Sequence, residues 1–203
     1  IKRASPSKGV LVTDTKTWQP QTLARDFSQS GAAALSVLTD EEFFWGNPKY
    51  VQFCKDVCGL PVLRKDFIVD PYQITESRWL GADAVLLIAR LLPEEELAQL
   101  AKKAMQFQMD VLIELHDEAD VAKALPIHEA MLGVNHRDLD TLSIDLERTR
   151  ELRAKIPKDR LVIAESGISK KEQIEAMMAM GYSGFLIGQA LTQSPDPKAF
   201  LAY

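Results

Sequence analysis

The sequence predicts an α/β fold in which a parallel β-sheet is enclosed by helices, as in a (β/α)8 TIM barrel. Three observations support this prediction. Seven short apolar runs alternate with segments of helical periodicity, the runs start roughly 20 to 30 residues apart, and polar residues follow almost every run. A repeat of this length fits a barrel, whose typical size is about 250 residues.

The predicted strands are apolar almost throughout, as expected of a sheet that is buried on both faces. They cover residues 34–38, 62–65, 84–88, 111–115, 130–135, 161–165 and 184–187. A doubly wound open sheet is the alternative architecture. The first strand, however, is not followed by the G-x-G-x-x-G pattern that is typical of dinucleotide-binding sheets.

Helical periodicity fills the intervals, over residues 22–29, 48–57, 72–80, 94–107, 119–125, 146–156 and 170–180. Several of these segments stop at a glycine, the residue that most easily adopts the left-handed conformation after a helix. The predicted stops are Gly31, Gly59, Gly81 and Gly181. Asp70, followed by Pro71, predicts an N-cap with proline in the first turn.

Seven strands leave a barrel one strand short. Ile1 and Lys2 resemble the end of an eighth strand, so we expect one barrel domain over residues 1–203 whose first strand is reduced to a stub. Seven strands and a stub would leave unpaired backbone groups at one edge of the sheet. We therefore expect the chain to be a fragment.

Composition and charge exclude several classes of protein. The net charge is −5 and no basic stripe interleaved with aromatic residues occurs, which argues against a nucleic-acid partner. No apolar run approaches the roughly 20 residues that a membrane span needs. Cys54 and Cys58 fit neither a zinc site nor a C-x-x-C pair, so no metal is predicted. Two free cysteines favour a reducing compartment, the cytoplasm or, in a photosynthetic source, a plastid.

Polar residues stand at the carboxyl ends of five predicted strands, the end that carries the active site in barrels. They are Thr39 and Asp40, Lys65 and Asp66, Glu114, Asn135 to Arg137, and Glu165 and Ser166. An ammonium at the end of a buried strand is costly unless water, a partner or a substrate receives it. Lys65 alone would be read as a solvated strand end, but five converging ends favour chemistry. Arg64 and Asp66 are expected to be structural.

A phosphate site is expected after the last two strands, where barrels often bind this group through glycine-containing turns and helix N-termini. Gly167 with Ile168, and Gly188 with Gln189, supply such turns, and Ser5 can add a hydroxyl. Each glycine alone could equally be an ordinary strand-to-helix turn. Their occurrence as a pair after consecutive strands favours phosphate.

Eight motifs, in order and over essentially the whole chain, resemble those of indole-3-glycerol-phosphate synthase. They are I-K-R-A-S-P-S-K-G, A-L-S-V-L-T-D-E-E-F-F, P-V-L-R-K-D-F-I-V-D-P-Y-Q-I, G-A-D-A-V-L-L-I, L-I-E-L-H-D-E, G-V-N-H-R-D-L, A-E-S-G-I and F-L-I-G-Q-A-L. The resemblance implies a (β/α)8 barrel of tryptophan biosynthesis that needs no cofactor. Its reaction closes the indole ring of 1-(2-carboxyphenylamino)-1-deoxyribulose 5-phosphate, with loss of CO₂ and water.

The same resemblance implies roles for the strand-end residues. Lys65 matches the general acid, Glu114 the glutamate of the dehydration step, and Lys2 a second lysine that contacts the substrate carboxylate. The remaining matches concern binding: Asn135 and Arg137 position substrate hydroxyls and carboxylate, Glu165 and Ser166 line the pocket, and Phe44 and Phe67 contact the ring. Leu86 and Ile88 could form the floor of this apolar slot, or belong to the core.

The chain departs from the family pattern at three places. The family has a glutamate two residues before Lys2 and a helical extension ahead of it, whereas this sequence begins at Ile1, so we expect an isolated chain of this length to be impaired. Ala4 stands at a position where a basic residue can occur in the family, and Gln189 stands where the family commonly has a serine. His116, His128 and His136 are expected to face solvent as bystanders.

The expected partner is a small phosphorylated substrate, handled by a monomer that could be fused to or associated with other tryptophan-pathway enzymes. Two alternatives remain open on the residues alone. One is another phosphosugar barrel, such as a phosphoribosyl isomerase, although those generally need a Cys/Asp or Asp/Asp pair where this chain has Lys and Glu or Asn. The other is a non-catalytic barrel that binds a phosphorylated ligand, or an inactive fragment.

Overall fold

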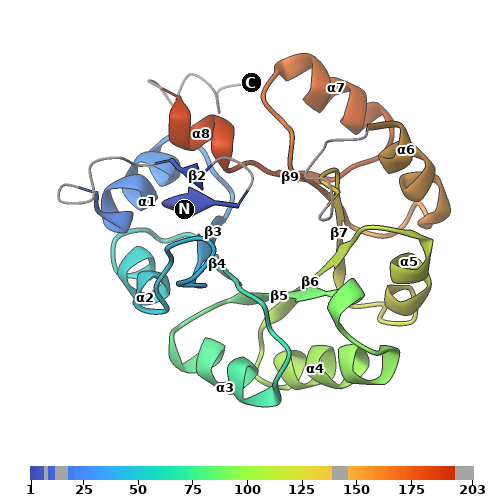
Figure 1. The fold of residues 1–203 in the computed structure, drawn as a ribbon, viewed down its shortest axis with the longest axis horizontal. Helices are drawn as coiled ribbons and strands as arrows, with labels where there is room; N and C mark the ends of the chain where they lie inside the picture. Colours follow the sequence, from blue (N-terminus) through green and yellow to red (C-terminus); the bar gives the residue numbers. More distant parts are fainter. Residues whose placement is uncertain (7–8, 12–17, 139–145, 195–203) are drawn as a thin grey trace.

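The computed structural model describes residues 1–6, 9–11, 18–138 and 146–194. In this part of the chain, seven parallel strands form one curled sheet in which each strand pairs with its neighbours in the sequence. The helices lie on the outside of the curled sheet (Figure 1). The predicted barrel-type architecture is therefore confirmed, as a seven-stranded parallel sheet enclosed by helices.

Each predicted strand and helix is present, with ends that differ from the prediction by at most two residues. The strands of the large sheet are β3 (Leu35–Leu38), β4 (Val62–Lys65), β5 (Ala84–Ile88), β6 (Asp110–Leu115), β7 (Met131–Asn135), β8 (Val162–Glu165) and β9 (Gly184–Leu186). The predicted helices are α1 (Pro20–Gln29), α2 (Lys49–Lys55), α3 (Pro71–Trp79), α4 (Glu94–Gln106), α5 (Glu118–Ala124), α6 (Leu146–Lys155) and α7 (Lys171–Ala179).

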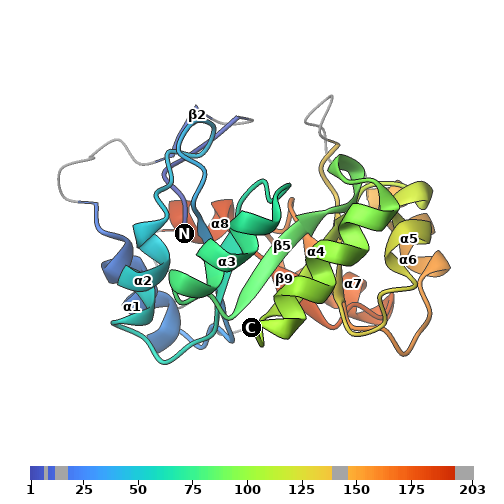
Figure 2. The same ribbon diagram turned by 90° about the horizontal axis from the view of Figure 1, so that it is seen from below.

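Four short elements were not predicted: the strands β1 (Ala4–Ser5) and β2 (Gly9–Val10), the 3-10 turn η1 (Ala89–Leu91) and the helix α8 (Gln189–Gln193). All are too short to leave a periodic pattern in the sequence. β1 and β2 pair in antiparallel fashion, and Figure 2 shows β2 at the end of the molecule toward which strand β5 points. The backbone nitrogen of Ala4 donates to the carbonyl of Phe44 at 3.2 Å, which ties β1 to the loop after β3.

Ile1 adds a partial strand to the β3 edge of the sheet. Its nitrogen donates to the Ser36 carbonyl at 2.5 Å, and its carbonyl accepts from the Leu38 nitrogen at 3.1 Å. This is the hydrogen-bond pattern of a parallel pair in which Ile1 lies beside Val37. Lys2 follows at the other edge, because a Cβ added to Gly188, just after β9, would lie 3.4 Å from its Cε. The predicted stub thus lies between the two ends of the open sheet.

Alternation along the strands divides the apolar residues into two clusters. The larger cluster lies between the sheet and the helices, and the smaller one fills the inside of the curl. Its buried members are Leu63, Ala84, Leu86, Ile88 and Leu112. Leu63 on β4 and Leu112 on β6 point into the curl, and the next inward positions, two residues later, are Lys65 and Glu114. The strand period therefore turns these charges into the mouth of the barrel rather than toward the helices.

The predicted helix boundaries are mostly explained by their caps. The Asp70 side chain accepts from the Tyr72 nitrogen at 2.7 Å, and Pro71 is the first residue of α3, as expected. Gly31, Gly81 and Gly181 adopt the predicted left-handed conformation after their helices, whereas Gly59 does not. No helix in the described ranges is long and apolar enough to cross a bilayer.

Two glutamines clamp the loops that follow β4 and β8 in the same way. The Gln73 carboxamide accepts from the Val69 and Asp70 nitrogens and donates to the Phe67 carbonyl. Gln173 repeats this pattern with the nitrogens of Ser169 and Lys170 and the carbonyl of Gly167. Each glutamine stands eight residues after a strand-end charge, Lys65 or Glu165. These clamps fix the path of the chain just outside the mouth of the barrel.

Candidate active site

Three charged side chains from separate strands meet inside the mouth of the curled sheet. Lys65 Nζ on β4 lies 2.7 Å from Glu114 Oε2 on β6 and 3.4 Å from Glu165 Oε2 on β8. The two carboxylates are buried, whereas the Lys65 side chain keeps 19% of its exposure. The sequence predicted each of these residues at a strand end, and the structure brings them together as one cluster open to solvent on the lysine side.

The cluster holds its charges in place. Burial alone would lower the pKa of Lys65, but the adjacent Glu114 and Glu165 carboxylates outweigh it and raise the pKa above its ordinary value. Burial likewise opposes ionisation of Glu114, yet the Lys65 ammonium beside it holds its pKa well below the usual range. Lys65 is therefore a stable ammonium and Glu114 a stable carboxylate at neutral pH.

Glu165 has the opposite tendency. Burial raises its pKa to about 7, with the neighbouring Glu114 charge adding to burial and Lys65 opposing it. Its Oε1 atom is buried without a hydrogen-bond partner among the described residues. A Cβ on Gly133, in the neighbouring strand β7, would lie 2.0 Å from that atom. Gly133 was not singled out in the sequence, although a glycine inside a strand is a recognised sign of a close approach.

Asn135 and Arg137 lie at the end of β7, as predicted. Asn135 Nδ2 donates to Glu114 Oε1 at 2.9 Å, and Asn135 Oδ1 accepts from the Arg137 backbone nitrogen at 3.0 Å. The Asn135 side chain thus links two groups: the Glu114 carboxylate and the backbone of the turn in which Arg137 lies. Its register partner on β8 is Glu165, so β7 and β8 contribute adjacent polar groups to the mouth.

Lys2 belongs to the same region. Burial and, next, the positive charges of Lys65 and Arg137 lower the pKa of Lys2 to about 8. Three cations therefore lie near one another at the mouth, with two carboxylates beneath Lys65. Such an excess of positive charge suits an anionic ligand.

The residues expected to bind phosphate occupy the turns after β8 and β9. Ser166 and Gly167 both adopt left-handed conformations, with φ of 69° and 73°, and Ile168 is buried. Gly188 caps the short helix α8, Gln189 is its first residue, and the Lys2 side chain packs next to Gly188. Ser5 is a buried residue of β1. Their joint role in binding phosphate stays a prediction.

An aromatic group stands at the rim beside Lys65. The Phe67 ring lies 6.3 Å from that of Phe44 and 6.0 Å from that of Phe43, between centroids. Asp40 Oδ1 accepts from the backbone nitrogens of Phe43 and Phe44, which fixes the turn of this loop after β3. Leu86 and Ile88 are members of the buried cluster inside the curl. Contact of these residues with a substrate ring stays a prediction.

Two of the three histidines were predicted wrongly. His128 is exposed as expected, but His116 and His136 are almost completely buried, with 0% and 1% exposure. His136 points away from the mouth: its Nδ1 is 3.0 Å from the Ser166 carbonyl, and its ring packs edge-on against Tyr182. His116 instead lies under the cluster, with Nε2 3.1 Å from Glu114 Oε1. The interval of four residues between His116 and Asp120 was the available signal.

Arg64 and Asp66 form a network on the opposite side of β4 from Lys65. The Arg64 guanidinium is buried and contacts Asp66 at 3.0 Å and Glu76 at 2.8 Å. It also donates to the hydroxyls of Thr39 and Ser77, both at 3.1 Å. These contacts join β3, β4 and α3, which agrees with the structural role expected for Arg64 and Asp66.

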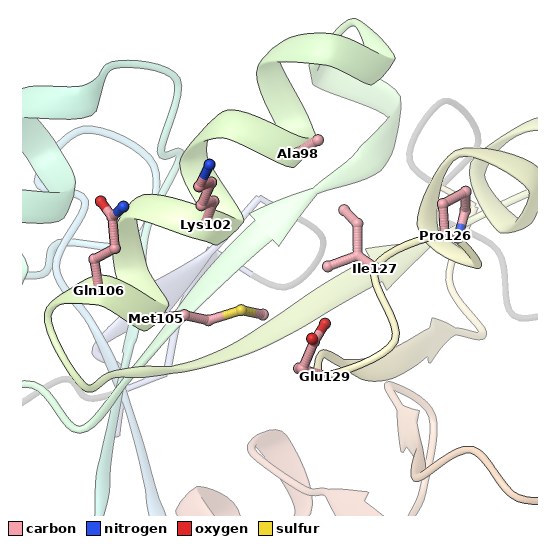
Figure 3. A pocket seen from close by; sticks show the side chains of 7 residues that line it. All are labelled: Ala98, Lys102, Met105, Gln106, Pro126, Ile127 and Glu129. Atoms are coloured by element: carbon pink, nitrogen blue, oxygen red, sulfur yellow. The ribbon is translucent and has the colours of Figure 1, made fainter.

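A hollow of about 430 Å³ on the outer surface does not belong to this cluster. It is lined by residues of α4, among them Lys102, and by the loop before β7, as Figure 3 shows. None of the strand-end residues described above lines it. Within the described ranges, no group of three or more His, Cys, Asp or Glu residues is arranged to hold a metal ion.

Comparisons with known proteins show which family the chain resembles over its whole length. The model of the family described as indole-3-glycerol phosphate synthase matches residues 1–203. The chain is 46% identical over 202 residues to an indole-3-glycerol phosphate synthase of Dechloromonas aromatica (strain RCB), covering 100% of the chain and 76% of the relative. A protein of the same name from Polaromonas naphthalenivorans (strain CJ2) is 44% identical over 202 residues, with the same coverage.

Solved structures show the fold alone. An orotidine 5'-phosphate decarboxylase from Pyrococcus horikoshii OT3 superposes with a TM-score of 0.70 at 10% identity, covering 92% of this chain and 93% of that one. An N-acetylmannosamine-6-phosphate 2-epimerase from Clostridium perfringens gives a TM-score of 0.68 at 15% identity, over 93% and 86% of the two chains. With the whole-length family match, the chain belongs to the indole-3-glycerol phosphate synthase family, a family of carbon–carbon lyases in tryptophan biosynthesis.

Proposed function

We propose that this chain carries out indole-3-glycerol phosphate synthesis with Lys65 as general acid and Glu114 as the acid–base group of dehydration. The substrate is 1-(2-carboxyphenylamino)-1-deoxyribulose 5-phosphate, and the products are indole-3-glycerol phosphate, CO₂ and water. The observation that carries the assignment of roles is the 2.7 Å contact between Lys65 Nζ and Glu114 Oε2 inside the mouth of the sheet.

Lys65 is suited to the first step. As the aromatic carbon attacks the substrate carbonyl, negative charge develops on the carbonyl oxygen and a proton must be delivered to it. The Lys65 ammonium is the partly exposed member of the cluster, and its two carboxylate partners keep it protonated. Loss of CO₂ then returns the bonding electrons to the ring, which restores its aromaticity.

Glu114 is suited to the second step, in which it removes a proton from the carbon next to the new hydroxyl and delivers that proton to the hydroxyl, which leaves as water. While Lys65 is charged, Glu114 is a weak base, because the ammonium stabilises its carboxylate. Once Lys65 has donated its proton, that stabilisation disappears and the basicity of Glu114 rises. The first proton transfer thus prepares the base that the second step needs.

The remaining residues would bind the substrate. Lys2 and Arg137 supply positive charge for the departing carboxylate, and Asn135 orients Glu114. Phe44 and Phe67 would hold the anthranilate ring at the rim, above the apolar floor that Leu86 and Ile88 form. The turns at Gly167 and Gly188 would bind the phosphate through backbone amides.

Incubating the full chain with this substrate tests the proposal, because product formation can be followed by indole fluorescence. We expect the indole product and CO₂ to form in equal molar amounts, and both to form about a hundredfold or more slowly in the Lys65→Ala variant. A second preparation carries at its N-terminus the corresponding segment of a relative. Comparing kcat of the two preparations measures how much that segment contributes to the rate. Absence of product from both preparations would favour a non-catalytic ligand-binding barrel.

We further propose a monomer in the cytoplasm. Cys54 is buried and Cys58 half-buried, and both are free thiols, which suits a reducing compartment. Sedimentation analysis of the purified chain measures the oligomeric state directly, and a dimer would contradict this part of the proposal.

A further inference from the structure

Glu114 has a second basic neighbour for which the proposed mechanism assigns no role. Lys65 Nζ approaches one oxygen of the carboxylate, Oε2, at 2.7 Å, whereas His116 Nε2 lies 3.1 Å from the other oxygen, Oε1. The His116 side chain has no exposure to solvent. Each oxygen of one carboxylate therefore faces a nitrogen of a different basic side chain, one at the mouth and one beneath it.

The other nitrogen of the His116 ring also faces a carboxylate. Nδ1 lies 3.7 Å from Asp120 Oδ2, an atom that already accepts from the His116 backbone nitrogen at 2.9 Å. Asp120 is buried, and its own nitrogen donates to the side chain of Asp117, the N-cap of α5. The Asp120 carboxylate is thus held in place next to the ring.

This arrangement favours the imidazolium form of His116. A neutral imidazole has one N–H, so its other nitrogen would present a lone pair to a carboxylate oxygen. Only the charged ring presents a donor to both Glu114 and Asp120. Burial lowers the pKa of His116, but contacts with Asp120 and then Glu114 outweigh burial and raise it to about 9. Neither ring nitrogen makes an aligned hydrogen bond, so the contacts are ion-pair contacts.

We propose that His116 is a positioning residue of the active site, a buried cation that holds Glu114 as an oriented carboxylate from the side opposite Lys65. This inference rests on the proposed function of Glu114. Asn135 Nδ2, which donates to the same oxygen at 2.9 Å, fixes the orientation from β7. When Lys65 gives up its proton, His116 keeps Glu114 in position and ionised for the next step.

The charged groups around this pair come from three elements, β4, β8 and α5. Glu114 faces Lys65 of β4 and lies near Glu165 of β8, and His116 faces Asp120 of α5. Lys123, one turn further along α5, is directed to the carbonyls of Ala89 and Leu92 instead. Loss of the His116 charge would therefore leave the Glu114 carboxylate paired with the Lys65 ammonium at the mouth and without a cation beneath it.

The alternative is that His116 only joins β6 to α5 as a buried side chain. Three variants separate the two roles: His116→Gln keeps a donor without a charge, His116→Phe removes both, and Asp120→Asn weakens the support for the imidazolium. We expect the acidic limb of the kcat/KM profile to move to higher pH by about 1 to 3 units in both His116 variants, because a cation at this distance lowers a carboxyl pKa by that amount. The Asp120→Asn variant should shift in the same direction by less.

In both His116 variants kcat should fall about tenfold near neutral pH, because Glu114 loses its orientation. KM should change less than about threefold, because His116 does not reach the mouth where substrate binds. His128→Gln, at the exposed histidine, is the matched control and should follow the wild-type profile. An unshifted acidic limb in His116→Gln, with the loss confined to thermal stability, would overturn the proposal. Inactivity of the wild-type chain would instead count against the proposed function.

A measurement without turnover keeps the proposal testable even if the variants fold poorly. The chain has three histidines, so their ring ¹⁵N resonances can be assigned with the His128→Gln and His136→Gln variants. We expect the His116 ring of the wild-type chain to be an imidazolium at pH 7.5, and the Glu114→Gln substitution to make it titrate at lower pH. A neutral His116 ring at pH 7.5 would overturn the proposal.

Discussion

Gly133 and Glu165 occupy adjacent strands so closely that a Cβ on Gly133 would lie 2.0 Å from Glu165 Oε1. Because Gly133 has no side chain, the buried Glu165 carboxylate has room to lie beside Lys65. Register explains the proximity, because Gly133 pairs with Ile163, two residues before Glu165 on the same face.

Gly133→Ala is therefore expected to displace Glu165 and to disturb the cluster. We expect kcat to fall by about tenfold or more and the free energy of unfolding to fall by about 1 to 3 kcal/mol, as for other overpacked sites. Gly59→Ala is the matched control, since a Cβ there meets no atom within 4 Å and its φ is not positive. Equal behaviour of the two variants in activity and urea unfolding would contradict this account.

Glu165 should make stability depend on pH in an unusual direction. Burial raises its pKa from 4.5 to about 7, so the folded chain binds a proton that the unfolded chain releases. Its contribution to stability is complete below pH 4.5 and is lost as the pH rises through 7. Urea unfolding of wild type and Glu165→Gln across this range should therefore show wild type losing stability relative to the variant. Parallel curves would refute the shift.

Lys2 should set the basic limb of substrate binding. Its pKa is lowered to about 8 by burial and by Lys65 and Arg137, so its charge is lost as the pH rises through that value. We expect KM to increase above pH 8, and Lys2→Met to raise KM by about tenfold or more at pH 7, the value of a hydrogen bond to a charged group. In the Lys2→Met variant KM should no longer rise above pH 8. A rise that persists in this variant would exclude Lys2 as the group whose deprotonation weakens substrate binding.

Cys54 should matter for packing alone. Its side chain is fully buried in the larger apolar cluster, between the sheet and the helices, and not in the mouth. Its Sγ lies 3.9 Å from the Pro20 carbonyl oxygen. Cys54→Ser is expected to leave kcat and KM unchanged and to lower the unfolding free energy by about 1 kcal/mol or slightly more, because it buries a more polar group. Cys58→Ser, at a half-buried position, should cost less. A large loss of activity would reveal an unrecognised role for α2.

The main elements and the central residues could be predicted from sequence because two simple patterns carry them. Apolar runs with period two define the strands, and the residues that break those runs at the carboxyl ends, such as Lys65 and Glu165, are the ones that enter the mouth. The short hairpin β1–β2 could not be predicted, because each strand has two residues and pairs through backbone groups alone.

His116 and Gly133 illustrate what such patterns leave out. Histidine after a strand is compatible with solvent, and the carboxylates of Asp120 and Glu114 on either side of the ring are what make burial of His116 favourable. Gly133 acts through the space beside a residue 32 positions later, which depends on strand register rather than on local sequence. Long-range packing, not local propensity, decides both.

The kinetics of Lys65→Ala, followed by indole fluorescence, test the central claim most directly. Lys55→Ala is the control. Lys55 Nζ lies 2.8 Å from Asp83 Oδ2, and this ion pair is remote from the mouth of the sheet, so the variant should retain wild-type kinetics. If Lys65 is the proton donor, its loss should lower kcat by about two orders of magnitude or more while KM stays within a few-fold of wild type. A Lys65→Ala variant with near-normal kcat would contradict the assignment of Lys65 as the general acid.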